Sequence, residues 1–217
     1  MPPDRPTWGG LFDRTGDAWT VEDVRAALAD RRAADRDQST DESGRGADSG
    51  RTAAASTEAE SRPDPDPAAV VADADVLAAD LLVGGDARAA LDCVRRHSWV
   101  RLPASDALLA DAAATVEAMA GPDLAADWRT RATAATEPVD HPAGDHPGLA
   151  SALRSGAAHV LTFDRDLTDA AAGTALRAHG DVSVREPAAF VTVFDPAAVY
   201  PAAVGGEYHG PDRDPRD

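Results

Sequence analysis

The chain has 217 residues, of which 43% are hydrophobic but only 5% aromatic, so one ordinary domain with a core of alanine, valine and leucine is expected. The 38 acidic residues outnumber the 21 basic ones, all of them arginine, which gives a formal net charge of -17. The only cysteine, Cys93, excludes an internal disulfide and a cysteine-based zinc site.

The excess of acidic residues has two open explanations. In salty cytoplasm, carboxylates keep a protein hydrated while the salt screens their repulsion. The other explanation is a partner with a basic surface. The acidic residues are spread along the chain, which favours salt adaptation, as in a halophilic protein. The negative net charge therefore does not argue against an RNA substrate. No apolar run approaches membrane-spanning length and the first residues lack a signal-peptide core, so a soluble cytoplasmic protein is expected, with no membrane partner.

The N-terminal zone, residues 1–34, is predicted to be a helical arm. Thr20 and Asp23 have the spacing of a capping box that opens the helix VEDVRAALADRR. Three of the ten aromatic residues precede this helix: Trp8, Phe12 and Trp19. We expect them to dock the arm onto the main domain of the same chain.

Two segments are predicted to be disordered. Residues 35–67 are rich in Ser, Asp, Gly, Glu and Pro and contain no Val, Leu, Ile or aromatic residue. Such a segment cannot bury enough apolar area to offset the entropy lost on ordering, which makes it a disordered acidic linker. The end of the chain, residues 198–217, is interpreted as a disordered tail.

The zone between them, residues 68–197, alternates strand and helix patterns. Strands are expected at 68–72, 99–103, 159–163 and 182–185, and helices at 86–97, 106–120, 123–135, 145–155 and 167–180. Such alternation is typical of right-handed crossovers between parallel strands. The predicted fold class is therefore α/β, a three-layer α/β/α sandwich with a central, mostly parallel sheet.

Acidic residues follow two of the expected strands. Asp73 and Asp75 come directly after the first strand, and Asp164 and Asp166 come after the strand HVLTF. Ligands of open parallel sheets bind at the carboxyl ends of the strands. These carboxylates are therefore expected to gather at one edge of the sheet.

Two helices are expected to add further carboxylates. Asp111 lies in the second turn of the helix that Ser105 caps, and Asp145 stands at the head of the helix DHPGLASALRS. Taken alone, each is explained as a solvated residue or a helix cap. Taken together, clustered carboxylates repel one another, and a divalent cation such as Mg²⁺ or Mn²⁺ relieves that repulsion.

The order of these segments resembles the PIN domain family over residues 70–194. VVADADVLAADLL is similar to the opening of such a domain, and ASDALLADAAATV to its second acidic helix. The most specific similarity is DHPGLASALRSGAAHVLTFDRDL, and VSVREPAAFVTVF resembles the closing strand and helix.

The resemblance implies a metal-dependent endoribonuclease that hydrolyses RNA phosphodiester bonds with Mg²⁺ or Mn²⁺. It places four residues on the family's acidic catalytic positions: Asp73, Asp111, Asp145 and Asp164. It implies that the metal ligands are Asp73, Asp145, Asp164 and Asp166, with Thr162 and Asp75 in secondary roles. RNA is the implied partner, and the family also includes homodimers and toxins with an antitoxin-like protein partner.

Three departures from the family pattern leave a catalytically weak member as an alternative. Asp111 stands where the family usually has the longer Glu, Ala74 and Asp75 replace a common Thr-Asn pair, and Phe163 replaces a frequent Gly. One alternative is therefore a PIN-like scaffold that binds RNA or protein without cutting. A remoter alternative is a phosphatase of haloacid-dehalogenase type, with Asp73 as nucleophile and Asp75 as general acid, although the chain has no lysine to balance a phosphoaspartate.

Overall fold

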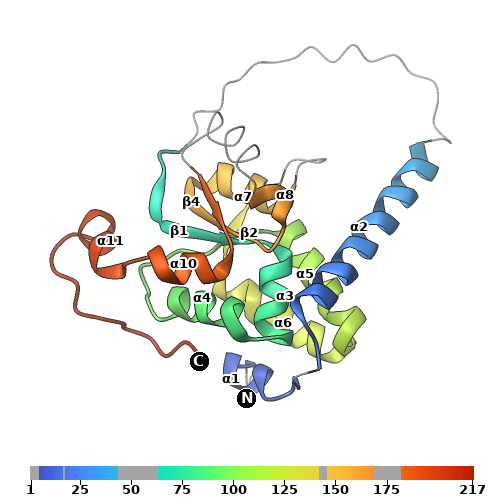
Figure 1. Cartoon of the computed structure of the whole chain (residues 1–217), viewed down its shortest axis with the longest axis horizontal. Coiled ribbons are helices and arrows are strands. Elements are labelled where there is room, and N and C mark those ends of the chain that lie inside the picture. The colour runs from blue at the N-terminus through green and yellow to red at the C-terminus, as the bar shows by residue number, and fades with distance from the viewer. Residues whose placement is uncertain (1–4, 17, 44–62, 142–145, 169–181) are drawn as a thin grey trace, which may run out of the picture.

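The computed structural model describes residues 5–16, 18–43, 63–141, 146–168 and 182–217. Its strands form two small parallel sheets (Figure 1). In the larger sheet, β4 (Ala157–Leu161) lies between β1 (Asp66–Ala72) and β5 (Ser183–Arg185). In the smaller sheet, β2 (Pro103–Ser105) pairs with β3 (Glu137–Val139). The parallel pairing confirms the expectation of a mixed α/β chain.

An isolated parallel bridge links β1 to the segment just before β2. The Arg101 N–H donates to the Ala68 carbonyl oxygen at 2.8 Å, and the Val70 N–H donates to the Arg101 carbonyl oxygen at 3.0 Å. The predicted strand at 99–103 lies too early in the chain, because the strand β2 begins at Pro103 and ends at Ser105. The strand β3 was not predicted.

The helices surround these strands (Figure 1). Their bounds are α1 (Trp8–Phe12), α2 (Val21–Ser43), α3 (Ala74–Leu82), α4 (Gly85–Arg95), α5 (Asp106–Ala120), α6 (Pro122–Ala135), α7 (Pro147–Ser155), α8 (Arg165–Thr168), α10 (Pro187–Val193) and α11 (Pro196–Ala203). Two predicted helix limits are confirmed in detail. Ser105 caps α5 by accepting the Leu108 N–H at 3.2 Å, and Gly156 ends α7 in the left-handed conformation with φ of 72°.

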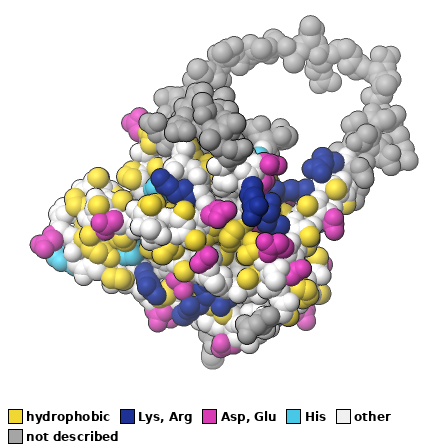
Figure 2. All heavy atoms as spheres, viewed as in Figure 1, with side chains coloured by type: hydrophobic (Ala, Val, Ile, Leu, Met, Phe, Trp, Pro, Cys, Tyr) yellow, Lys and Arg dark blue, Asp and Glu magenta, His cyan; other side chains and the backbone are white. Residues whose placement is uncertain are grey.

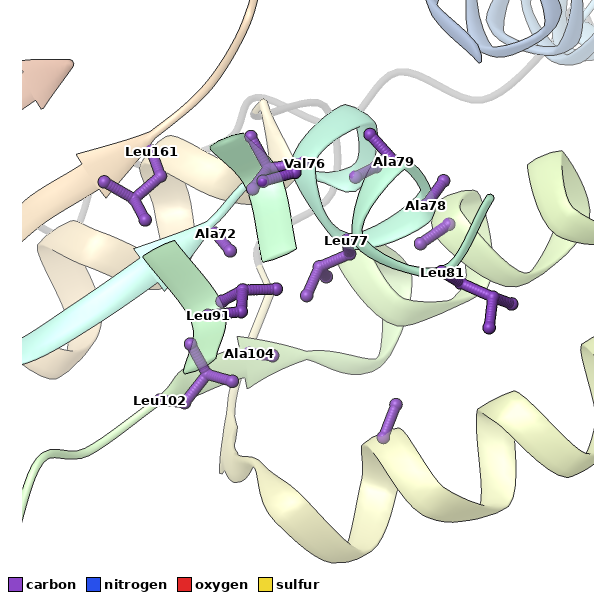
Figure 3. Packing of buried hydrophobic residues seen from close by; sticks show 14 of the residues in the cluster. Ala72, Val76, Leu77, Ala78, Ala79, Leu81, Leu91, Leu102, Ala104 and Leu161 are labelled. Atoms are coloured by element: carbon purple, nitrogen blue, oxygen red, sulfur yellow. The ribbon is translucent and has the colours of Figure 1, made fainter. Parts of the chain in front are cut away.

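The core is built from small apolar side chains, as the composition indicates. Val70 and Val71 of β1 are completely buried, and every residue of α3 is buried as well, mainly against α4 and α5. Figure 3 shows Val76 and Leu77 of α3 among alanine and leucine side chains from the strands and from α4. Because α3 follows β1 without a loop, this packing fixes the point where the strand ends.

The N-terminal arm docks onto the rest of the chain. Trp8 and Phe12 are buried, with the Arg95 guanidinium 4.1 Å from the Trp8 ring and that of Arg88 3.8 Å from the Phe12 ring. Docking of these two aromatic residues is confirmed, whereas Trp19 remains exposed. The arm therefore belongs to the body of the protein.

The capping box at the start of α2 is confirmed as well. The Thr20 N–H donates to Asp23 Oδ2 at 2.8 Å, and the Asp23 N–H donates to Thr20 Oγ1 at 3.3 Å. The helix that follows differs from the prediction at its far end, because it continues to Ser43 into the segment predicted as linker. Residues 44–62 of that segment lie outside the described residues, and in Figure 1 the far end of α2 extends away from the body.

The prediction of a disordered tail at 198–217 also differs from the structure. The segment begins within α11 and then returns to α1 and α4. The Arg216 carbonyl oxygen accepts the Gly9 N–H at 2.9 Å, and its guanidinium lies 2.8 Å from Asp92 Oδ2. Specific polar contacts therefore hold a segment whose composition resembles that of a disordered one. Within the described residues, none of the helices combines the length and the apolar character that a membrane span needs.

Candidate functional site

Asp73 and Asp75 lie where β1 passes directly into α3. Asp73 is the N-cap of α3, and its Oδ1 accepts the Ala74 N–H at 2.9 Å. Its own N–H donates to the Leu161 carbonyl oxygen at 2.8 Å, which joins the end of β1 to the end of β4. Both carboxyl groups are almost fully buried, with 1% of Asp73 and 2% of Asp75 exposed. The predicted gathering of acids at this edge therefore begins with two neighbouring buried carboxyl groups.

Thr162 connects these two carboxyl groups. Its Oγ1 lies 3.3 Å from Asp73 Oδ2 and 3.3 Å from Asp75 Oδ2. A hydroxyl has one proton, so it cannot donate to both carboxylates at the same time. Burial, and then the negative charge of Asp73, raise the pKa of Asp75 to about 7, so Asp75 carries a proton in part of the molecules at neutral pH. The Phe163 N–H, 2.9 Å from Asp75 Oδ2, holds this carboxyl group in place.

Asp164 completes the acidic wall of a cavity. It follows β4 and lines, together with Asp73 and Asp75, a cavity of about 210 Å³. Its N–H donates to Thr162 Oγ1 at 3.1 Å, and its Oδ1 accepts the Asp166 N–H at 3.0 Å. Asp166 itself is exposed and does not line this cavity. The structure therefore brings together Asp73, Asp75, Thr162 and Asp164, but not Asp166.

Asp111 joins this cluster through an arginine of the arm. Arg32 of α2 donates from Nε to Asp111 Oδ2 at 3.1 Å, and its Nη2 lies 3.7 Å from Asp73 Oδ1. One guanidinium therefore compensates the charges of a strand-end acid and of the acid on α5. The sequence analysis missed Arg32 because nothing in the local pattern shows where α2 docks.

The start of α7 approaches the same carboxylate from another side. His146 Nε2 lies 3.7 Å from Asp73 Oδ2 and 3.5 Å from Arg32 Nη1. A Cβ atom added at Gly148 would lie 2.9 Å from Asp73 Oδ1, so α7 can pack here only because residue 148 has no side chain. Asp145, the predicted acid at the head of this helix, lies outside the described residues. His146 is a neighbour of Asp73 that the sequence analysis did not single out.

The donor set suits a hard divalent cation held by few protein ligands. In the part of the chain that the structure describes, no three His, Cys, Asp or Glu side chains are arranged to hold one metal ion together. Mg²⁺ keeps several waters, however, and is often bound through only one or two carboxylates. Asp73 and Asp164 supply two such groups on one cavity wall. The pKa of Asp75 is raised first by burial and then by the negative charge of Asp73, and a cation would relieve the second of these.

Comparison with known proteins gives one match. The model of a family of unknown function, DUF7384, matches residues 64–216. No curated protein and no solved structure matches the chain. The match covers the strands, the acids of the cavity wall and the tail, while α1 and α2 precede it.

Proposed function

Since the chain belongs to this family, whose function is unknown, its activity has to be inferred from the site, and we propose that it is a PIN-type metal-dependent endoribonuclease. The observation that carries the proposal is the acidic wall of the cavity, where Asp73, Asp75 and Asp164 meet. These residues follow two adjacent parallel strands, β1 and β4. Parallel sheets bind their ligands at such an edge.

The proposed fold is the three-layer sandwich of a PIN domain. The parallel order of β1, β4 and β5, with helices between successive strands, supports this assignment. So does the sequence resemblance over residues 70–194, whose most specific segment supplies α7, β4 and Asp164.

Asp73 and Asp164 are the residues that would hold Mg²⁺ or Mn²⁺, with Asp145 and Asp166 as the further ligands that the resemblance implies. Such an ion, when bound, supplies a nucleophilic water and stabilises the charge that develops on a phosphodiester. Thr162 orients the carboxyl groups of Asp73 and Asp75 by contacting both. Asp111 has a positioning role, because it reaches the cluster through Arg32.

A PIN-like scaffold that binds RNA or protein without cutting is the second candidate. The observation that favours the scaffold is Arg32, because its guanidinium already compensates the negative charges of Asp73 and Asp111. In that case the acids would serve an internal ion-pair network and would need no metal. The two candidates therefore differ in whether the cluster binds a divalent cation.

Cleavage of a mixed-sequence RNA by the full-length protein tests the proposal, in high potassium chloride with Mn²⁺, Mg²⁺ or EDTA. We expect cleavage with either metal and none in EDTA. Cleavage that persists in EDTA would contradict the metal-dependent mechanism. Absence of cleavage, together with absence of Mn²⁺ binding in calorimetry, would favour the scaffold.

A further inference from the structure

One face of α2 is basic and borders the acidic cavity. Three arginines line the cavity, Arg25, Arg32 and Arg36, together with Leu28 and Ala29. Their spacing of three, four and seven residues places all five on one side of a helix. Leu28 is 5% exposed and anchors the helix to the core, so the arginines beside it are fixed toward the cavity.

Among the acids of α2 whose side chains the structure describes, none lines this cavity. Glu22, Asp23 and Asp30 are exposed to solvent instead, with Asp23 and Asp30 on the opposite side of the helix. The cavity therefore has an acidic wall at the ends of β1 and β4 and a basic wall on α2. Figure 2 shows basic side chains gathered where α2 meets the body of the protein, with acidic side chains beside them.

Internal ion pairs do not account for the whole basic wall. Arg32 pairs with Asp73 and Asp111, but its Nη2 is buried without a hydrogen bond. Arg25 lines the cavity but forms no ion pair with any residue that the structure describes, although the chain contains 38 acidic residues and 21 arginines. An arginine left without a carboxylate in so acidic a protein is available to an anion from outside.

We propose that the arginine face of α2 binds the phosphodiester backbone of a nucleic acid strand whose scissile phosphate enters the acidic cavity. This inference rests on the proposed ribonuclease function and assigns its substrate-binding wall. Arg25 and Arg36 are eleven residues apart, which is about 16 Å along a helix and long enough to follow several phosphates. Guanidinium groups bind phosphate through paired N–H donors.

The arm thereby supplies positive charge that an acidic domain needs to hold RNA. Phosphate neutralisation by basic side chains is the main source of affinity for nucleic acid. Since α2 precedes the family match at residues 64–216, this wall is contributed by the arm of this chain and not by the matched region.

Binding of a fluorescein-labelled single-stranded RNA oligonucleotide tests the proposal, measured by anisotropy with the full-length protein in Ca²⁺ over a range of potassium chloride. Arg25→Ala and Arg36→Ala should each weaken binding roughly three- to tenfold and lower the slope of log K against log salt by about 0.7 to 1. Arg25→Lys should retain most of the slope. Arg31→Ala is the matched control, because Arg31 is exposed on the same helix but does not line the cavity.

Equal effects of Arg25→Ala and Arg31→Ala would overturn the proposal, since they would indicate only general attraction. Absence of RNA binding by the wild type, or unchanged binding in both cavity variants, would overturn it as well. Cleavage by the wild type with unchanged binding in the variants would refute the arginine wall while leaving the nuclease intact. Selective loss of binding without any metal-dependent cleavage would support the wall and refute the nuclease.

Discussion

Replacement of Arg32 by alanine should have opposite effects on stability and on metal affinity. The charge-assisted hydrogen bond from Arg32 to Asp111, at 3.1 Å, has a typical net value of about 1.5–3 kcal/mol. The contact with Asp73, at 3.7 Å, corresponds to a gross attraction of about 4 kcal/mol at an effective dielectric constant near 20, much of it offset by desolvation. In EDTA, Arg32→Ala should therefore lower the free energy of unfolding by about 2–4 kcal/mol.

The same substitution removes a cation that competes with a metal ion for these carboxylates. Each 1.4 kcal/mol of relieved competition tightens binding tenfold, so Mn²⁺ should bind Arg32→Ala about tenfold or more tightly than the wild type. Mn²⁺ should then restore much of the lost stability, because binding to the native state alone stabilises it. Calorimetry with Mn²⁺ and urea unfolding with and without Mn²⁺ measure the two effects.

Arg31→Ala is the control, since it makes the same change of charge outside the cavity. Arg32→Lys keeps the charge and should remain close to the wild type in Mn²⁺ affinity. Unchanged or weaker Mn²⁺ binding by a folded Arg32→Ala protein would refute the reasoning, because the carboxylates would then not be a cation site that Arg32 occupies.

Three further predictions concern other contacts of this structure. Burial and then Asp73 raise the pKa of Asp75 from its usual 3.8 to about 7 in the folded protein. Between these two values only the unfolded state ionises at this group, so the metal-free protein should lose stability as the pH rises from about 4 to 7 and level off above that. Asp75→Asn should gain stability over the wild type across the same pH range in urea unfolding, and a pH-independent difference would contradict this. Arg95→Met removes the nearer of the two arginines that pair with the buried Asp80 and leaves only Arg88, 3.9 Å away. It should lower the free energy of unfolding by about 3–5 kcal/mol, and a change below about 1 kcal/mol would show that the pair with Arg95 contributes little. Gly148→Ala places a Cβ against the Asp73 carboxylate, so it should reduce the rate of RNA cleavage while circular dichroism shows a retained fold; full activity would mean that Asp73 tolerates displacement.

The strand-end acids could be predicted because their positions follow from local patterns. An apolar run such as 68–72 followed by acids indicates a buried strand and its carboxyl end, and parallel pairing then brings Asp73 and Asp164 together. Helix caps such as Ser105 are equally local. Those parts of the fold and site need no knowledge of distant contacts.

The other parts depend on contacts between distant segments. Arg32 and Asp111 are 79 residues apart in the sequence, and they meet only because α2 docks across the site. The strand β3 has the sequence Glu-Pro-Val, which has no strand pattern. It is held at the edge of β2, where the Glu137 N–H donates to the Leu102 carbonyl oxygen at 3.0 Å. The tail is held by single polar contacts such as that of Arg216 with Asp92, which composition does not reveal. A repeat of arginine at positions 25, 32 and 36 was the available signal for the basic wall.

Cleavage by Asp73→Asn beside the wild type tests the central claim most directly, with Mn²⁺ in high potassium chloride and the same RNA. Glu117→Gln is the control, an exposed acid on the helix that carries Asp111. The site predicts that Asp73→Asn folds but does not cleave, that Asp164→Asn behaves in the same way, and that Glu117→Gln cleaves like the wild type. Equal cleavage by the wild type and Asp73→Asn, after removal of contaminating nuclease, would contradict the assignment of the acidic cavity as the catalytic site.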